Sequence, residues 1–344
     1  MKILYHSPRE SFNVKKGSGK RPYEMFRSLK GLGHDVDIIQ GRGKNRLRKV
    51  FGESMEWDKY DFCYSEPPSS PIHPLYDYPF LYKIRKHDVP LAVFYRDTYW
   101  KFADHFSKDG VKKYVFRAAH FAEVDLYTKL ADIVYFPSEY SLELSLKAAT
   151  RDVLWPGCNK QNPIEREEVS DIIYVGGISE RYGIHNLVGM MRELENNDIV
   201  LHLVCREGEY ERLNDKTSNA IESLPIYVYH ESGEGLEPIY NKSDIGIIPF
   251  RDTYYNNMAM PVKLFEYMSF GLPVVSTKCK TIARFVENNG CGVICRDDPV
   301  ELAEGVMSLM HDLGKVNTIS KNSIETAKRN TWEDRAAEVC AFFS

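Results

Sequence analysis

The chain contains two successive series of short apolar runs, and each run is separated from the next by a helical or polar segment. The first series lies at residues 2–5, 35–39, 61–64, 91–95 and 133–136, and the second at residues 172–175, 199–204, 226–228, 245–248, 273–276 and 292–294. Short buried runs that alternate with helices are typical of parallel sheets covered by helices on both faces. The sequence therefore predicts an α/β protein with two Rossmann-like, doubly wound domains.

A polar stretch at residues 158–169 lies between the two series and is typical of an interdomain linker. We therefore predict one domain at residues 1–158, a second at residues 170–319, and a helical segment at residues 320–344. The length of 344 residues is suited to two domains of medium size. Doubly wound sheets bind ligands at the carboxyl ends of their strands, so the binding site is expected in a cleft between the domains, with the linker as hinge.

The sequence favours a cytoplasmic protein. It has no apolar stretch of the ~20 residues that a membrane-spanning helix needs, and its N-terminus lacks the pattern of a signal peptide. The seven cysteines are scattered and form no Cys-x-x-Cys pair. We expect them to be reduced thiols rather than disulfides or zinc ligands.

Positive charge is concentrated in the first part of the chain. The net charge is −4, but residues 9–49 are rich in Lys and Arg, and Lys112 and Lys113 follow a segment with Trp100 and Phe102. Lysines mixed with aromatic residues suit peripheral contact with an anionic membrane surface, here the inner face of the membrane. A solvated surface above an aromatic core is the alternative.

Residues 240–277 carry the most informative pattern. Pro261 precedes the sequence Val-Lys-Leu-Phe-Glu-Tyr-Met, so Lys263 and Glu266 lie on one face of an expected helix. Lys263 is near the helix start, where free N–H groups and the helix dipole favour an anion such as pyrophosphate. Glu266, one turn further, is suited to accept hydrogen bonds from two ribose hydroxyls. A solvated Lys–Glu pair is the alternative.

This segment resembles the nucleotide-sugar-binding signature of GT-B glycosyltransferases of the group 1, or family 4, type, in a subgroup with the motif Pro-x-Lys-x-Phe-Glu-Tyr. Gly33-His34, Ala131-Asp132 and Trp332-Glu333 are similar to further motifs of that family, so the resemblance extends over nearly the whole chain. It implies two domains that face a cleft, with residues 320–344 crossing back to the first domain. It also implies that no cofactor or metal is required, because the helix dipole and basic side chains take the place of a metal.

The activity implied by the resemblance is hexosyl transfer. The donor would be a nucleotide-diphosphate sugar, with UDP as the default, and the acceptor a saccharide or a lipid-linked saccharide in surface polysaccharide or glycoconjugate assembly. The expected donor-binding residues are Lys263, Glu266, Pro261, Arg181, Gly177, Ser232 and Gly233.

Two positions depart from the family pattern. Many retaining members carry an Arg directly after the glycine that ends the first strand of the second domain, and a Lys soon after, where this chain has Gly177 and Tyr182. The carboxylate usually found eight residues before Glu266 is replaced by Met258. Whether transfer retains or inverts the anomeric configuration is therefore open.

Asp97 is the candidate catalytic base. It follows Arg96 at the carboxyl end of a predicted strand, and an inverting transferase needs a group that takes the proton of the acceptor hydroxyl. A helix cap or turn is the alternative for Asp97, and Arg96 is a candidate for orienting the base or binding phosphate. Gly17, Ser18 and Gly19 form a candidate loop for the acceptor or a phosphate, with a plain turn as the alternative.

Other function classes fit less well. An epimerase or a phosphorylase would share the fold, but no phosphorylase-type lysine or phosphate site stands out. A nucleic-acid-binding protein would use the basic N-terminal stretch, but its charge is local and no nucleic-acid motif is present, so no nucleic-acid partner is expected. A non-catalytic relative that binds nucleotide sugars or polyanions is the alternative to a transferase.

Overall fold

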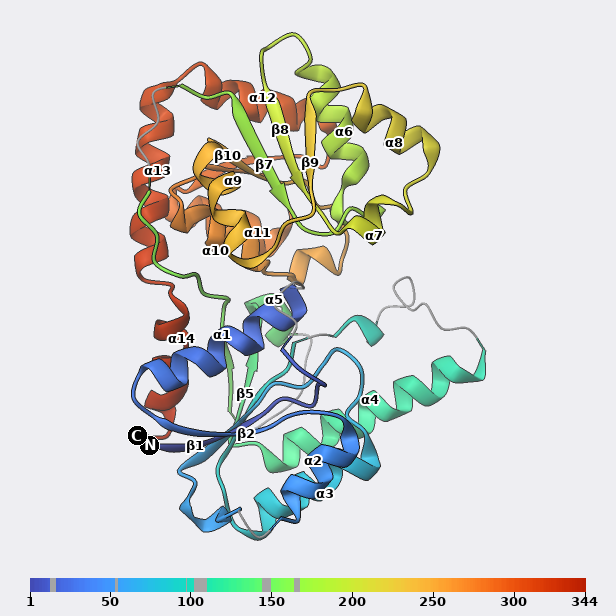
Figure 1. Ribbon diagram of the computed structural model, residues 1–344, viewed down its shortest axis with the longest axis vertical. Coiled ribbons are helices and arrows are strands. Elements are labelled where there is room, and N and C mark those ends of the chain that lie inside the picture. The colour runs from blue at the N-terminus through green and yellow to red at the C-terminus, as the bar shows by residue number, and fades with distance from the viewer. Residues whose placement is uncertain (13–16, 53–54, 97, 102–109, 144–149, 164–167) are drawn as a thin grey trace. The chain divides into compact units, whose positions relative to one another are not determined.

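The computed structural model describes residues 1–12, 17–52, 55–96, 98–101, 110–143, 150–163 and 168–344. The chain divides into two compact units, and each has its own sheet (Figure 1). Unit 1 contains residues 1–155 and 332–344, and unit 2 contains residues 156–331. The C-terminal division differs from the expected one. Residues 320–331 belong to unit 2, and only the segment from Trp332 onward belongs to unit 1.

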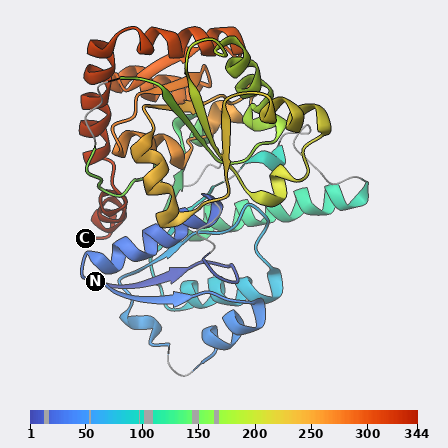
Figure 2. The ribbon, with the colours of Figure 1, turned by 45° about the horizontal axis from the view of Figure 1, so that its top comes forward.

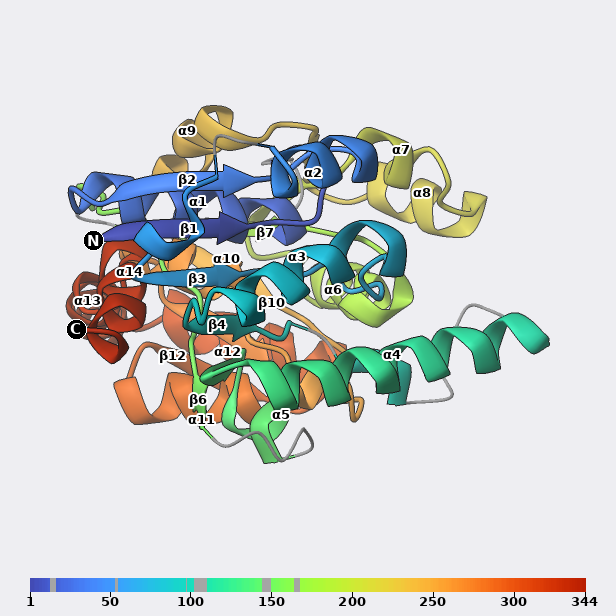
Figure 3. The same ribbon diagram turned by 90° about the horizontal axis from the view of Figure 1, so that it is seen from below.

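Unit 1 is built on a parallel six-stranded sheet with the strand order β2-β1-β3-β4-β5-β6 (Figure 3). Its described elements are β1 (Lys2–His6), α1 (Gly17–Gly31), β2 (Asp35–Ile39), α2 (Gly43–Val50), η1 (Trp57–Lys59), β3 (Phe62–Ser65), α3 (Pro74–Lys86), β4 (Leu91–Phe94), η2 (Tyr99–Lys101), α4 (Val111–Leu130), β5 (Ile133–Phe136), α5 (Glu139–Glu143), β6 (Arg151–Val153) and α14 (Trp332–Phe342). Successive side chains of a strand point to opposite faces, so the apolar strands of this sheet supply apolar side chains to both of its faces.

One face of this sheet packs against α2, α3 and α4. Leu4, Cys63 and Val93 from the strands meet Phe80 and Tyr127 from the helices. The opposite face is covered by α1 and α14, which pack beside each other. The ring of Phe343 stacks on that of Phe62 with centroids 4.5 Å apart. Phe343 therefore packs against the sheet of unit 1 while its side chain stays partly exposed.

Unit 2 has a second parallel six-stranded sheet, with the order β12-β11-β10-β7-β8-β9 (Figure 2). Its elements are β7 (Asp171–Val175), η4 (Glu180–Tyr182), α6 (Ile184–Glu193), β8 (Val200–Val204), α7 (Glu207–Tyr210), α8 (Asp215–Glu222), β9 (Ile226–Tyr229), η5 (Gly233–Leu236), α9 (Glu237–Lys242), β10 (Ile245–Ile248), η6 (Asn256–Met258), α10 (Val262–Ser269), β11 (Val274–Thr277), α11 (Lys280–Asn289), β12 (Gly292–Cys295), α12 (Pro299–Met310) and α13 (Leu313–Lys328). Read from β9, this is the 3-2-1-4-5-6 order of a Rossmann sheet.

The strand order of unit 2 defines the place where a ligand fits. The chain leaves β7 toward β8 and β9 on one side, and β10 then continues toward β11 and β12 on the other. The strand order therefore reverses between β7 and β10, and in Rossmann sheets ligands bind at the carboxyl ends of the strands at this switch point. The predicted α/β class with two doubly wound domains is confirmed.

Candidate functional site

Three segments meet at the switch point of unit 2: the loop after β7, the loop after β10, and the start of α10. Tyr267 fixes α10 against the two strands, because its hydroxyl lies 3.0 Å from the amide nitrogen of Val175 and 3.4 Å from the carbonyl oxygen of Ile247. Lys263 is one helical turn before Tyr267. The anchored tyrosine therefore holds the N-terminal end of α10 at the carboxyl ends of β7 and β10.

Lys263 is a buried cation aimed at the loop after β7. Its side-chain nitrogen lies 3.8 Å from the centre of the Tyr174 ring and 5.1 Å from that of Phe250. A Cβ placed on Gly176 would lie 2.8 Å from the same nitrogen. Lys263 is only 9% exposed, and its Nζ has no hydrogen-bond partner among the residues that the structure describes. Burial lowers the pKa of Lys263 to about 7, although the charge of Glu266 acts in the opposite direction.

Glu266 lies on the same helix, one turn after Lys263, and is only partly buried. Its Oε2 accepts a hydrogen bond of 3.2 Å from the hydroxyl of Tyr240 in α9. The Tyr240 ring stacks on Phe270 with centroids 4.6 Å apart. The carboxylate is thus oriented by a buried tyrosine, while its partial exposure leaves it accessible to a ligand.

Arg181 supplies a second cation in the loop after β7. Its guanidinium lies over the rings of Tyr182 and Tyr255, 4.6 Å from each centre. Asn256 donates a hydrogen bond of 3.0 Å to the Arg181 carbonyl oxygen and ties this loop to the one after β10. Stacking and hydrogen bonding together restrict the position of the arginine.

Gly183 allows the two loops to approach each other closely. It has a φ of +79° and forms the N-cap of α6. A Cβ at this position would lie 1.7 Å from the carbonyl oxygen of Pro249. Only glycine satisfies both the left-handed backbone and the close contact, so this residue permits the close approach of the two loops.

The structure places the predicted donor-binding residues of unit 2 as follows. Pro261 is the N-cap of α10, and Gly177 lies against the ring of Tyr182, since a Cβ there would be 2.6 Å from it. Pro261, Gly177, Arg181, Lys263 and Glu266 therefore belong to elements that converge at the switch point.

Ser232 and Gly233 lie after β9, the edge strand two places from β7. Their part in donor binding stays a prediction. Met258 is 5% exposed, so the position where the family pattern has a carboxylate is part of the apolar interior here.

Unit 1 has a second group of charged residues at the carboxyl ends of β3 and β4. Glu66 is fully buried, accepts a hydrogen bond of 2.7 Å from Arg21 Nε, and lies 2.9 Å from the Tyr5 hydroxyl. Arg96 lies beside this carboxylate, with Nη2 3.7 Å from Oε1. Asp97, the candidate base, lies outside the described residues.

Gly17, Ser18 and Gly19 occupy the first turn of α1 rather than a loop before it. The glycines flank a helix start whose first N–H groups have no intrahelical acceptor. The sequence pattern places the loop and the helix next to each other but does not locate the boundary between them. The role of these residues in binding a phosphate or acceptor stays a prediction.

The sequence analysis missed the aromatic residues of the unit 2 site. Tyr174 contacts Lys263, Tyr240 contacts Glu266 and Tyr255 contacts Arg181. The partners in each pair are distant in sequence, and only the fold brings them together. The sequence does mark Tyr174 and Phe250 as candidates, because each lies at or just after the end of an apolar run. Their contact with Lys263 can be predicted only when the strand order is known.

The described part of the chain has neither a metal-binding cluster nor a membrane-spanning helix. No cluster of three or more His, Cys, Asp or Glu side chains there is arranged to hold a metal ion. Among the same residues, no helix combines the length and apolarity needed to cross a bilayer. Metal independence stays a prediction.

Comparison with known proteins shows which sequences and structures this chain resembles. Residues 169–312, most of unit 2, match the family model described as Glycosyl transferases group 1. No curated protein sequence matches the chain. Among solved structures, sucrose-phosphate synthase from Thermosynechococcus elongatus has a TM-score of 0.72 at 15% identity, covering 100% of this chain and 98% of that one.

Two further solved structures are similar along their whole length. Anabaena HepE, in complex with UDP and glucose, has a TM-score of 0.69 at 16% identity, with 99% of both chains covered. WaaG, a glycosyltransferase involved in lipopolysaccharide biosynthesis, has a TM-score of 0.68 at 13% identity, again with 99% of both covered. The protein therefore has the two-domain GT-B fold of glycosyltransferases, and its unit 2 carries the segment that matches their group 1 family.

Proposed function

We propose that the protein is a glycosyltransferase that uses a nucleotide-diphosphate sugar, with UDP as the nucleotide, and that unit 2 binds this donor. The observation that carries the proposal is the buried Nζ of Lys263 at the start of α10, which lies over the Tyr174 ring but has no hydrogen-bond partner among the described residues. Burying a cation without a hydrogen-bond acceptor or an anion costs free energy. A diphosphate at this helix start would accept hydrogen bonds from both the lysine and the first free N–H groups of α10.

The neighbouring residues suit the rest of such a donor. Glu266, oriented by Tyr240, is placed to accept hydrogen bonds from ribose hydroxyls, and Arg181 adds a second positive charge beside the loop of Gly177. Positive charge around the diphosphate stabilises the leaving group as the bond to the sugar breaks. The choice of UDP is supported by HepE, which shares the fold and was solved with UDP and with UDP-glucose.

The acceptor side of the proposal belongs to unit 1. A saccharide or a lipid-linked saccharide in surface polysaccharide or glycoconjugate assembly is the proposed acceptor. Asp97 is the proposed base that takes the proton of its hydroxyl, and Arg96, beside the Glu66 carboxylate, is the proposed orienting group.

The test is a thermal-shift titration with UDP-glucose, UDP and GDP. A ligand that binds only the folded state at 100 times its Kd stabilises it by about 2.7 kcal/mol. UDP-glucose and UDP are expected to raise the Tm, and Lys263→Met and Glu266→Gln are expected to abolish the shift. Lys216→Met, at an exposed position on α8, is the control that should keep it. Absence of a shift with every nucleotide would overturn the proposal.

The alternative is a relative that binds nucleotide sugars without catalysing transfer. The two differ in turnover, which release of UDP in the presence of candidate acceptors measures. Nucleotide binding that depends on Lys263, without UDP release for any saccharide or lipid-linked saccharide, would favour the binding protein.

We also propose that α4 makes peripheral contact with an anionic membrane surface. Val111, Tyr114 and Val115 are between 63% and 77% exposed near its start, next to Lys112 and Lys113. Figures 1 and 3 show α4 extending past the strands of unit 1. An apolar strip beside lysines is typical of helices that lie on anionic bilayers.

A vesicle co-sedimentation assay tests this contact. The protein should sediment with phosphatidylglycerol vesicles and stay in the supernatant with phosphatidylcholine vesicles. Val115→Asp should abolish sedimentation with the phosphatidylglycerol vesicles, whereas Tyr82→Ser, at an exposed site on α3, should leave it unchanged.

A further inference from the structure

The carboxyl ends of β1, β3 and β4 in unit 1 carry a cluster of charged residues that the donor site does not use. The chain passes from β1 to β2 on one side of the sheet, and β3 then pairs with β1 on the other side. Doubly wound sheets bind ligands where the strand order reverses in this way. Arg9 lies in the loop after β1, Glu66 follows β3 directly, and Arg96 is the second residue after β4.

Glu66 is the buried carboxylate of this cluster, and both of its oxygens already have donors. Arg21 of α1 donates a hydrogen bond of 2.7 Å from Nε to Oε1, and the Tyr5 hydroxyl donates one of 2.9 Å to Oε2. The Arg21 guanidinium also lies over the Phe94 ring, 3.6 Å from its centre, and Arg21 is only 4% exposed. Glu66 and Arg21 therefore form a buried ion pair in which each charge is compensated by the other.

Two further arginines lie near the same carboxylate. Arg96 Nη2 is 3.7 Å from Glu66 Oε1, which is longer than a hydrogen bond. Arg9 Nε and Nη2 are buried and have no hydrogen-bond partner in the described part of the chain. Burial and the charge of Arg96 lower the pKa of Arg9 to about 10, although Glu66 acts in the opposite direction. Three arginines and one carboxylate leave these groups with a net charge of +2 (3 − 1).

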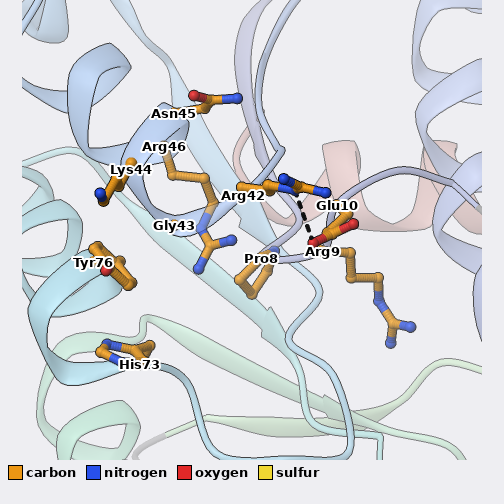
Figure 4. A pocket seen from close by; sticks show the side chains of 10 residues that line it. All are labelled: Pro8, Arg9, Glu10, Arg42, Gly43, Lys44, Asn45, Arg46, His73 and Tyr76. Carbon is orange, nitrogen blue, oxygen red and sulfur yellow. Dashed lines mark ion pairs between the residues drawn. The ribbon is translucent and has the colours of Figure 1, made fainter.

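The side chain of Arg9 points away from the basic residues of α2. A cavity of about 620 Å³ lies between the loop after β1, α2 and α3, and Arg9 and Lys44 are on opposite sides of it (Figure 4). Arg46 of α2 is neutralised by Asp77 through hydrogen bonds of 2.7 and 2.8 Å. The charges that act on Arg9 are therefore those of the cluster around Glu66.

We propose that Arg9 and Arg96 bind an oxyanion carried by the acceptor of the transfer reaction, so that the acceptor is an acidic saccharide. Guanidinium groups hold carboxylates and phosphates through paired, charge-assisted hydrogen bonds. Both arginine side chains keep part of their surface exposed, which gives an anion access to them. The oxyanion is either the carboxylate of a uronic acid or a phosphate group. The identification of this ligand as the acceptor rests on the proposed function, which assigns the acceptor to unit 1.

Calorimetric titration at low ionic strength, where screening is weak, tests the site. Methyl glucuronide represents the uronic acid, glucose 1-phosphate represents the phosphate, and methyl glucoside is the uncharged control. At least one of the two anions should bind, and methyl glucoside should not. Arg9→Met and Arg96→Gln should each weaken binding about tenfold or more, because each removes a charge-assisted contact. Lys44→Gln, on the opposite side of the cavity, should change the Kd less than about twofold.

The stability of Arg9→Met distinguishes a binding residue from a structural one. Burial and the charge of Arg96 disfavour the charged form of Arg9 in the folded state. Removing this charge should therefore leave the urea midpoint unchanged or raise it, while binding of the anion is lost. A lowered midpoint would show that the folded chain already satisfies this guanidinium, and it would overturn the inference.

The same variants separate this inference from the donor proposal. UDP-glucose should bind Arg9→Met as it binds the wild type, and Lys263→Met should lose UDP-glucose and keep the anion. Failure of both anions to bind, or equal affinities of wild type and Arg9→Met for them, would overturn the oxyanion site and leave the donor site standing. Binding of an anion that depends on Arg9, without any binding of UDP-glucose, would support the oxyanion site and overturn the donor proposal instead.

Discussion

The ionisation of Lys263 links the donor site to pH. With a pKa of about 7 in the free protein, the lysine becomes neutral as the pH rises, whereas a bound diphosphate favours its charged form. Affinity for UDP-glucose should therefore fall by up to about tenfold per pH unit above about pH 7. Calorimetry between about pH 6.5 and 8.5 measures this, and UDP-glucose is suitable because its phosphates do not titrate there. Lys263→Met should bind weakly with no such slope; an unchanged wild-type Kd across the range would contradict the proposed contact.

The same residue makes the stability of the free protein depend on pH. The pKa of Lys263 is lower in the folded state than the value of about 10.4 expected for an unfolded chain. Between these values the unfolded state binds more protons, so the free energy of unfolding rises with pH. Urea midpoints measured from about pH 7 to about pH 10 should increase more for the wild type than for Lys263→Met. Parallel curves for the two proteins would show that this lysine is not titrating in the window.

Gly183 carries the strictest local requirement in unit 2. Alanine there meets both a positive φ and the Pro249 carbonyl oxygen, so Gly183→Ala should lower stability by roughly 2–4 kcal/mol and weaken UDP binding. Gly208→Ala is the matched control, because nothing lies within 4 Å of its added methyl group. Urea unfolding followed by circular dichroism checks both. A small effect at Gly183 would mean that the two loops separate easily.

Sequence reasoning could group Lys263 and Glu266 because both lie within one short helix. Tyr174 and Tyr240 were not predicted as their partners, because those contacts join β7 and α9 to α10 through the tertiary fold. The basic character of residues 9–49 is likewise visible in the sequence, but the pairing of Arg46 with Asp77 of α3 appears only in the fold.

At the scale of elements, strands were predicted best where they are buried on both faces. β3, β4, β5 and β10 are continuous buried runs. β6 is an edge strand with largely exposed residues, and its sequence, Arg-Asp-Val, carries almost no apolar signal. It is a strand because β5 pairs with it, which no local pattern encodes.

The C-terminal segment shows how an element can belong to a unit far from it in sequence. α14 packs on α1, and Phe343 stacks on Phe62 of β3. Phe343→Ala should destabilise unit 1 by roughly 1–3 kcal/mol, less than for a fully buried Phe because its side chain is partly exposed. Phe342→Ala, whose ring is 42% exposed, should cost less than about 1 kcal/mol. Tryptophan fluorescence in urea measures the difference; equal midpoints would show that the C-terminal residues do not contribute to this core.

At the scale of the whole molecule, two sheets with separate cores predict two cooperative unfolding steps. The sequence provides a probe that distinguishes them. All four tryptophans, Trp57, Trp100, Trp155 and Trp332, belong to unit 1, whereas both units contribute helices to far-UV circular dichroism. Fluorescence excited selectively at tryptophan therefore reports unit 1 alone.

This difference assigns the proposed donor to its unit without a mutation. UDP-glucose should raise the midpoint of a step seen by circular dichroism and leave the tryptophan transition within error, because it stabilises unit 2 by mass action. If UDP-glucose moved both transitions equally, the two units would unfold as one cooperative body, and binding in either would stabilise both.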